Sequence, residues 1–508
     1  MSRNRTQKSA INASVSLGAH LFSIVLSFVA RTVFVACMQT EYLGISGLFT
    51  NILTVLSLAE LGLGDALLFA LYRPVKEQNR DELARLIGFA KKIYYVLALV
   101  VLLIGTGVSF FLNSLIKDVP DIPESLRVIF FIYLANSAAS YLMAYKSMIL
   151  TADQRQYVSS LIGQGAKVAQ LLLQIGVLLI SQNFYAYLVC QVICTLGNNV
   201  AVMVYINRHY PYLNKKGAGK PEKQTVKKMI SDVRSLSVSK IAGVVANGTD
   251  NIIISKLIGL TQVGLASNYS MIVSAANGVL WQGVNALMGS IGNFNVDAEE
   301  ERKGKVFDQL QLLSYWLYSY VFIGITVMAN SFVGECWLGE EFLLDSKTVF
   351  AMALPLYVSG VNYAAYSFRV TKGVFGKIQY FHLAAGVLNL VVSVLAAPYL
   401  GMFGVFLATS VTRVLTSELA DGYLVAKKVL GRTFRWYVGK YVLLFGVMMG
   451  NLLITGAAVH FIPLSGMIGF LVKGVCCVLV CNGIFLLVFG KTEAFRGLLG
   501  RGKALRGK

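Results

Sequence analysis

Residues 93–113 read IYYVLALVVLLIGTGVSFFLN, an apolar run without a charged side chain. As a helix rising about 1.5 Å per residue, this run is long enough to cross the hydrocarbon core of a bilayer. About fourteen apolar segments of this kind fill the chain and predict an all-α integral membrane protein. They lie at 13–36, 43–71, 93–113, 126–145, 157–180, 185–206, 236–258, 263–292, 309–333, 348–368, 379–400, 403–426, 441–460 and 467–489.

The composition of the chain agrees with a protein that lies mostly in lipid. Of its 508 residues, 56% are hydrophobic and 14% are charged, and the mean hydropathy is +0.65. A soluble protein carries roughly a quarter charged residues. The first apolar segment follows Arg3 and Arg5 and continues past Thr32 without a small-residue cleavage site. We therefore expect it to be retained as a span and not removed as a signal peptide.

Positive charge gathers on every second connection between the predicted spans. The outer connections carry only Lys117 and Lys347. Most of the 45 Lys and Arg residues lie at 1–12, 72–92, 146–156, 207–235, 293–308, 369–378, 427–440 and after 489. Because Lys and Arg resist translocation, this asymmetry predicts that both termini are cytoplasmic. The same rule accounts for the net charge of +20 without a nucleic-acid partner.

Several classes of enzyme lack the residues that they would need. The chain has no GxxxxGK[ST] phosphate loop and no Asp-x-Asp pair. The predicted outer loops at 114–125 and 334–347 are too short for a catalytic domain of a glycosyltransferase or glycan polymerase. Cys190 and Cys194 have one-turn spacing, but no histidine accompanies them, so we expect packing and no metal site. The sequence predicts a transporter that is not an enzyme.

The two halves of the chain resemble one another. Residues 43–53 can be aligned with 263–273, and Gln156-Tyr157 is echoed by Gln379-Tyr380. We therefore expect two pseudo-symmetric six-helix lobes. The predicted domains are a first lobe at 1–206, a basic, flexible cytoplasmic linker at 207–235, a second lobe at 236–426, and two additional helices with a basic tail at 427–508.

Polar side chains form stripes along several predicted spans and are the candidates for a substrate site. The stripes contain His20, Arg31, Lys167, Gln170, Asn247, Asp250, Asn251, Asn277 and Arg413. A charged side chain at the bilayer centre costs roughly 2.5–3.5 kcal/mol. Arg31, Lys167, Asp250 and Arg413 must therefore face water or one another. Closed ion pairs, such as Arg31 with Asp250, are one alternative. Three of these four are cationic, which favours a hydrated, net-positive cavity between the halves that accepts an anion.

Three stretches carry a resemblance to a known family. Residues 42–49 read YLGISGLF, residues 58–65 read LAELGLGD, and residues 399–405 read YLGMFGV. In these stretches and in its whole-chain architecture, the sequence resembles the oligosaccharide flippases of the polysaccharide transporter family. Their superfamily, the multidrug/oligosaccharidyl-lipid/polysaccharide exporters, also contains multidrug antiporters and the peptidoglycan-precursor flippase.

The resemblance implies a function in cell-surface polysaccharide biosynthesis. Spans 1, 2, 7 and 8 would line a cavity in which cations receive the diphosphate of a polyprenyl-linked oligosaccharide, and Arg31 matches a cavity arginine of the family. Lys167 and Arg413 come from the stripes alone. The last two spans would add a groove for the lipid tail. The implied location is the bacterial plasma membrane, with membrane lipids and, as further partners, the glycosyltransferases and polymerase of the pathway.

A coupling proton or sodium ion is the expected energy source, and no other cofactor is expected. The titratable candidates are Asp250, Glu60, Asp65 and His20, of which Asp250 lies deepest in its span. His20 on a serine-lined face could also be a hydrogen-bonded packing residue. Glu418 and Asp421 are expected at the membrane interface. Consumption of the substrate on the far side could also drive transport without an ion.

Three alternative functions remain from the sequence. A peptidoglycan-precursor flippase would share both the fold and the chemistry. A multidrug or metabolite antiporter would favour cationic substrates, and hence an acidic cavity, which the excess of basic stripe residues argues against. A membrane glycan polymerase is disfavoured by the short outer loops.

Overall fold

The computed structural model describes residues 2–60, 62–214, 219, 221–285, 300–372 and 378–506, and these residues contain helices but no β-strand. The predicted all-α fold is thus confirmed. Among the described residues, 11 helices are long and apolar enough to cross a membrane. The chain divides into two compact units, Met1–Val244 and Val245–Lys508. The predicted domain limits remain predictions.

The difference between the 11 candidate spans and the fourteen predicted ones has two sources. One candidate, Ile378–Lys428, is 51 residues long and covers the predicted spans 379–400 and 403–426. The predicted spans 236–258 and 263–292 are not among the candidates. The first of these is divided between a helix that ends at Gly248 and one that begins at Asp250, and the second continues past Asn285, where residues 286–299 lie outside the described residues. The exact count of fourteen therefore stays a prediction.

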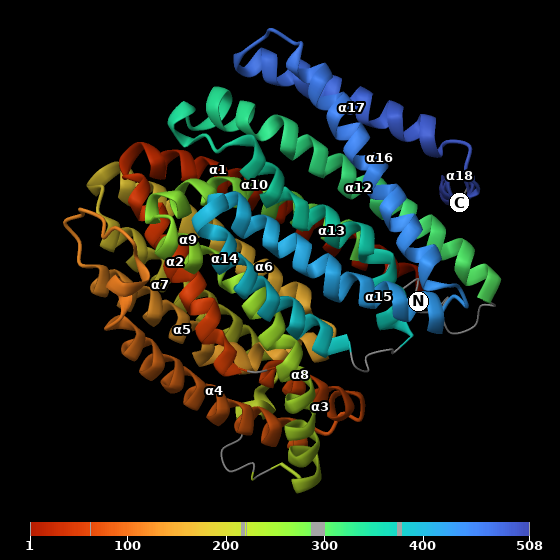
Figure 1. The fold of residues 1–508 in the computed structure, drawn as a ribbon. Coiled ribbons are helices and arrows are strands. Elements are labelled where there is room, and N and C mark those ends of the chain that lie inside the picture. The colour runs from red at the N-terminus through yellow and green to blue at the C-terminus, as the bar shows by residue number, and fades with distance from the viewer. Residues whose placement is uncertain are drawn as a thin grey trace. The chain divides into compact units, whose positions relative to one another are not determined.

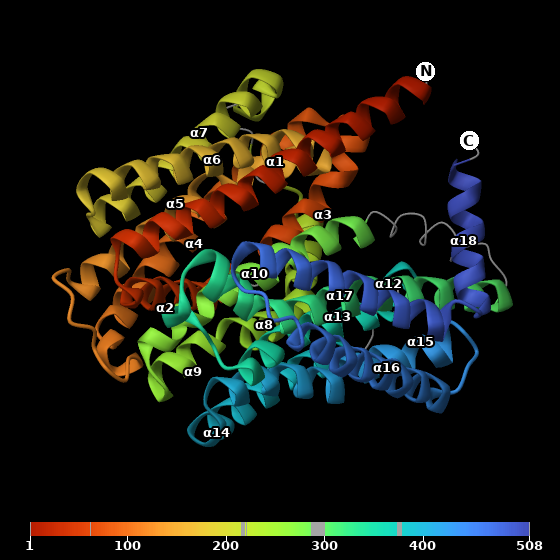
Figure 2. The same cartoon turned by 90° about the horizontal axis from the view of Figure 1, so that it is seen from above.

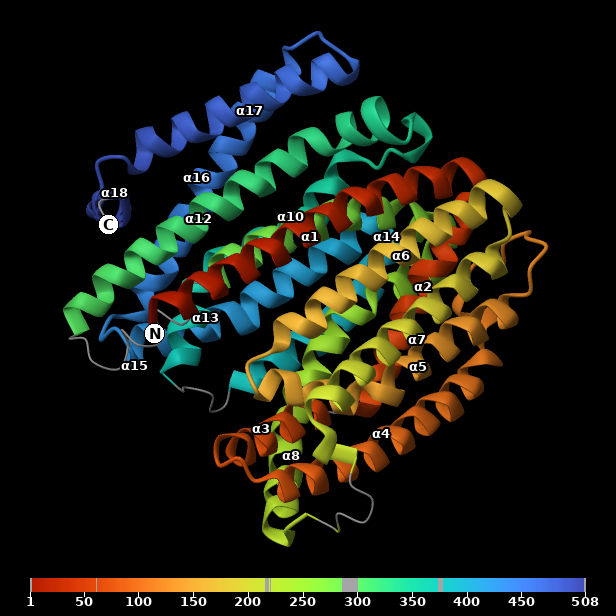
Figure 3. The ribbon, with the colours of Figure 1, turned by 180° about the vertical axis from the view of Figure 1, so that it is seen from behind.

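In the first unit, helices pack against helices that are adjacent in the sequence and against others that are distant in the sequence. Its helices are α1 (Ser2–Cys37), α2 (Thr40–Leu56), α3 (Leu63–Lys76), α4 (Arg80–Ser109), α5 (Leu126–Ala152), α6 (Gln156–Ser181), α7 (Phe184–His209) and most of α8 (Lys223–Gly248). Helix α5 packs against α4 and α7, and α6 packs against α1 and α7 (Figures 1 and 3).

Close approach of α4 and α5 depends on a glycine. A Cβ atom at Gly105 would lie 2.4 Å from Cδ1 of Leu134, so only a residue without a side chain lets the helices meet there. Aromatic rings fill space between α2 and α5, since Phe49 of α2 meets Phe130 of α5 edge to face at 5.1 Å. Apolar packing of this kind positions the polar side chains of the unit.

The predicted span 43–71 is interrupted. Helix α2 ends at Leu56, a 3₁₀ turn follows at Ser57–Glu60, and α3 begins at Leu63. Gly62 adopts the left-handed conformation, with φ 78°, which glycine accepts readily. The chain therefore breaks its helix within the glycine-containing stretch 60–65. A second interruption separates α8 from α9 (Asp250–Leu257) at Thr249.

The second unit is also helical. It contains α9, α10 (Leu260–Asn285), α12 (Glu300–Asn330), a π turn η4 (Ser331–Trp337), α13 (Ser346–Thr371), α14 (Ile378–Arg413), a second π turn η6 (Val414–Glu418), α15 (Leu419–Lys428), α16 (Phe434–His460), α17 (Gly466–Phe489) and α18 (Glu493–Arg506). Helix α12 packs along α13, and α16 and α17 pack against one another and against α12 (Figure 2).

Helix α14 is a hairpin rather than one straight helix. Gly401 has φ 59° and ψ −147°, a conformation that breaks the helix just after Pro398. The two arms then run back along one another, because Asn389 reaches Thr409 and Ser393 reaches the carbonyl of Val405. This turn separates the two predicted spans, which end at 400 and begin at 403, close to where the structure divides them.

Candidate functional site

Arg31 of α1 lies close to aromatic side chains of other helices. Its side chain is half-buried and lies near the phenols of Tyr133 on α5 and Tyr187 on α7. Phe34, one turn further along α1, meets the Tyr187 ring edge to face at 5.2 Å. The packing of α5 and α7 thus brings two phenols close to the guanidinium of Arg31.

The polar stripe of α6 separates into two parts. Lys167 is exposed, whereas Gln170 is half-buried. The Gln170 amide donates to Oε1 of the buried Gln174 at 3.3 Å, and Gln174 donates to the backbone oxygen of Tyr187 at 3.1 Å. Gln170 therefore belongs to a chain of hydrogen bonds that joins α6 to α7. Lys167 lies on α6, the helix that packs along α1 and hence along the helix of Arg31.

The titratable candidates of the first unit have different surroundings. Glu60 accepts a hydrogen bond from the Tyr94 hydroxyl at 3.2 Å. Asp65 of α3 forms an ion pair with Lys240 of α8 at 3.1 Å, and both side chains are about half exposed, at 46% and 54%. His20 is half-buried on α1. Asp65 thus has a partner near the surface that helical periodicity does not reveal.

Asp250 begins α9 and faces the α14 hairpin. Its Oδ2 accepts a hydrogen bond from the Thr409 hydroxyl at 3.4 Å, while its Oδ1 is buried without a hydrogen-bond partner. The Asn389 amide donates to the Thr409 hydroxyl at 2.9 Å, and Ser393 donates to Oδ1 of Asn389 at 2.8 Å. A chain of hydrogen bonds thus runs from the Asp250 carboxylate through Thr409 and Asn389 to Ser393.

The unpaired carboxylate oxygen is the unusual atom of this chain of hydrogen bonds. A buried carboxylate oxygen without a hydrogen-bond donor is costly, and a proton or a cation would lower that cost. The polar stripes identified Asp250 but not Asn389 and Ser393. A signal for these two was present, since both are polar, four residues apart and on one face of an otherwise apolar arm.

The predicted asparagines are not among these residues. Asn251 is half-buried on α9, and Asn277 is exposed on α10. The side chain of Asn247 lies outside the described residues. Among the residues that are described, no group of three or more His, Cys, Asp or Glu side chains is placed to hold a metal ion.

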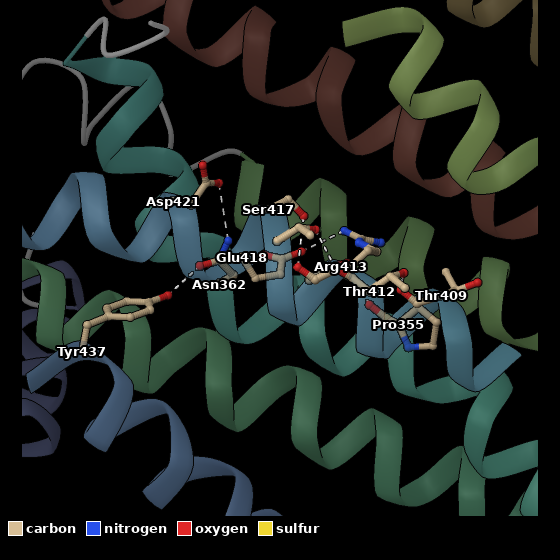
Figure 4. A network of polar contacts seen from close by, with 11 residues as sticks. Pro355, Asn362, Thr409, Thr412, Arg413, Ser417, Glu418, Asp421 and Tyr437 are labelled. Atoms are coloured by element: carbon tan, nitrogen blue, oxygen red, sulfur yellow. Dashed lines mark hydrogen bonds and ion pairs between the residues drawn. The ribbon is translucent and has the colours of Figure 1, made fainter. Parts of the chain in front are cut away.

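Arg413 ends α14 and pairs with Glu418 across the π turn η6. Nη2 of Arg413 lies 3.1 Å from Oε1 of Glu418, as the dashed line in Figure 4 shows. Hydroxyl groups bond to backbone oxygens around this turn, with Thr416 donating to Thr412 at 2.6 Å and Ser417 donating to Arg413 at 3.2 Å. Such π turns inside helices are frequent at functional sites.

A second ion pair is buried beside the first. Nε of Arg369 on α13 lies 2.8 Å from Oδ1 of Asp421 on α15. Asn362 donates to Asp421 at 3.5 Å and accepts a hydrogen bond from the Tyr437 hydroxyl of α16 at 2.6 Å. The network therefore joins α13, α15 and α16 (Figure 4), and it attaches the first of the two additional helices to the unit.

The expectation that Glu418 and Asp421 lie at the membrane interface stays a prediction, but neither carboxylate is exposed. Glu418 is 6% exposed and Asp421 is 2% exposed. The carboxylates can be buried because each faces an arginine, and paired, hydrogen-bonded charges avoid the cost of lone ones. No local pattern signals the second pair, since Arg369 lies 52 positions before Asp421 by their numbers.

Comparisons with known proteins agree with this architecture. The model of a family described as "Polysaccharide biosynthesis protein" matches residues 9–288, more than half of the chain. No protein of curated function matches the sequence. Among solved structures, the lipid II flippase MurJ in an inward closed conformation superposes with a TM-score of 0.67 at 14% identity, covering 94% of this chain and 98% of that one.

Multidrug transporters have the same fold. An inward-facing MATE family transporter of the MOP superfamily superposes with a TM-score of 0.62 at 13% identity, covering 85% of this chain and 99% of the other. The Vibrio cholerae MATE transporter VcmN, in its bent form, gives a TM-score of 0.54 at 15% identity, with 85% and 99% covered. The chain is a multi-pass membrane protein that belongs to the polysaccharide biosynthesis protein family and has the MOP-superfamily transporter fold.

Proposed function

We propose that this protein is a flippase that moves a polyprenyl-diphosphate-linked oligosaccharide from the inner to the outer leaflet of the bacterial plasma membrane by alternating access. It acts as a transporter without an enzymatic step, and both termini are cytoplasmic. The oligosaccharide is too polar to cross hydrocarbon, so the protein offers it a hydrated path while the prenyl tail stays in lipid. Glycosyltransferases supply the substrate and a polymerase consumes it.

The observation that carries this proposal is the partial exposure of two arginines within candidate membrane spans. Arg413 keeps 27% of its side chain exposed although its partner Glu418 is buried, and Arg31 is half-buried among aromatic rings. A guanidinium is suited to bind phosphate oxygens through two parallel hydrogen bonds. Lys167, exposed on α6, can add a further charge for the diphosphate.

The test removes these charges one at a time. Arg31→Ala and Arg413→Ala should abolish transport while leaving the amount of protein in the membrane unchanged. Arg73→Ala is the matched control, because Arg73 is an arginine on α3 whose side chain is 84% exposed and which forms an ion pair with the neighbouring Glu77. Wild-type transport by both Arg31→Ala and Arg413→Ala would contradict a cationic substrate site.

We also propose that an inward gradient of sodium ions or protons drives the cycle through Asp250. The support is the buried, unpaired Oδ1 of Asp250 and the hydrogen bond of its Oδ2 with Thr409, from which a polar chain continues to Asn389 and Ser393. Asp250→Asn should remove the dependence of transport on sodium and pH. Asp65→Asn, which changes a half-exposed carboxylate, should leave that dependence intact. An unaltered dependence in Asp250→Asn would instead place the coupling at another group, and a wild type without any such dependence would favour transport driven by consumption of the product.

The peptidoglycan precursor remains the main alternative substrate, because it too is a polyprenyl-diphosphate-linked sugar. The fold shared with MurJ is compatible with both. Competition between the two lipids in one transport assay distinguishes them, since the true substrate should inhibit transport of the other at the lower concentration. An antiporter of cationic drugs would instead lose little activity in the arginine variants.

A further inference from the structure

The Arg413–Glu418 ion pair is asymmetric in its access to the surroundings. The Arg413 side chain is 27% exposed and the Glu418 side chain is 7% exposed. The Arg413 side chain is thus partly open to its surroundings, whereas its carboxylate partner is not. The pair spans η6, a π turn, a kind of distortion that recurs where helices carry function.

The buried cluster around this pair is balanced in charge. Arg369 and Asp421 form one pair and Arg413 and Glu418 the other. The titratable groups of the neighbouring helices are His382 of α14, which lies near Arg369 and Arg413, and Tyr437 and Tyr441 of α16, which lie near Glu418. Asn362 of α13 is the neutral neighbour of both carboxylates. Two arginines thus offset two carboxylates.

We propose that an anionic phosphate which takes Arg413 from Glu418 causes the Glu418–Asp421 pair to take up one proton. This inference rests on the proposed function and adds that substrate binding is itself coupled to a proton, at a place separate from Asp250. When the phosphate oxygens bind Arg413, one arginine remains for two buried carboxylates. A lone buried charge is costly. A proton from water forms an O–H bond with one carboxylate, and the cluster becomes neutral again.

With a phosphate on Arg413, protonation of one carboxylate leaves Arg369, Glu418 and Asp421 without net charge. Without substrate, Glu418 neutralises Arg413, so the arginine does not need an anion from solution. With substrate bound, the phosphate neutralises Arg413. A proton then takes the place of Arg413 at the carboxylates. The contact joins one nitrogen, Nη2, to Oε1 of Glu418 at 3.1 Å, and a guanidinium has five N–H donors, so it can also donate to a phosphate.

The experiment measures protons taken up on binding by the purified full chain. The probe is a short-chain prenyl diphospho-N-acetylglucosamine, in which both phosphates are esterified and so keep a constant charge near neutral pH. Calorimetric titrations in buffers that differ in ionisation enthalpy give the net protons per bound probe. We expect uptake of about one proton for the wild type, because one buried carboxylate loses its partner.

The matched variant is Glu418→Gln, which keeps the size and hydrogen bonding of the side chain but cannot titrate. It should bind the probe with no proton uptake. Infrared difference spectra provide a second readout, in which the carbonyl band of a protonated carboxylic acid should grow on binding to the wild type but not to Glu418→Gln. Binding without uptake in the wild type, or equal uptake in both, would overturn the inference. Failure of the wild type to bind would instead contradict the proposed function.

Discussion

Replacing Arg369 with Met should strongly destabilise the second unit. The Arg369 and Asp421 side chains are only 5% and 3% exposed, and their charged atoms lie 2.8 Å apart. Removing the guanidinium leaves Asp421 buried with the longer, 3.5 Å contact from Asn362. Breaking a buried pair in this way costs about 3–5 kcal/mol, whereas replacing both partners with apolar residues is often neutral or stabilising.

Reversible unfolding of the purified protein in mixed micelles measures this cost. Arg369→Met should lower the free energy of unfolding by about 3–5 kcal/mol. The double variant Arg369→Met with Asp421→Leu should recover most of that loss, since no lone charge remains. A single variant as stable as the wild type, or a double variant at least as unstable as the single one, would refute the reasoning that burial of these carboxylates depends on the arginines.

Two further predictions concern packing and surface charge. Gly360→Ala should lower the free energy of unfolding by about 1–3 kcal/mol, because the added Cβ would lie 2.0 Å from Cγ of Tyr318. The control Gly324→Ala, with open space around the added atom, should not lower the stability. Equal losses of stability in both variants would argue against a close approach at Gly360. Lys240→Ala should cost less than about 1 kcal/mol, because its pair with Asp65 is about half exposed. A larger loss in the same unfolding assay would show that this pair is shielded from solvent.

Much of the fold could be predicted from the sequence because the strongest signals are local. Apolar runs of spanning length and the break near Gly401 can both be seen within a few residues, and the structure has a helical hairpin there. Helix α8 was harder to predict. The charged segment from Lys223 onward was expected to be part of a flexible linker, but it begins a helix. Charged residues do not prevent helix formation, because propensity depends little on hydropathy.

The candidate site was harder to predict because it depends on contacts between distant segments. Asp250 could be recognised as a carboxylate in a polar stripe, but its connection through Thr409 to Asn389 and Ser393 requires the α14 hairpin to fold back. The burial of Glu418 beside Arg413 follows from a π turn, and no simple spacing rule predicts one. Periodicity locates the faces of helices, whereas their partners depend on tertiary packing.

The most direct test of a flippase with a cationic substrate site uses proteoliposomes that contain only this protein. A polyprenyl-diphosphate-linked oligosaccharide with a fluorescent sugar is placed in the outer leaflet, and a membrane-impermeant quencher measures the fraction that crosses with time. The wild type should move the lipid, whereas Arg31→Ala and Arg413→Ala should be no faster than protein-free vesicles. Movement at the wild-type rate by both variants, or none by the wild type under any imposed sodium or proton gradient, would contradict the account.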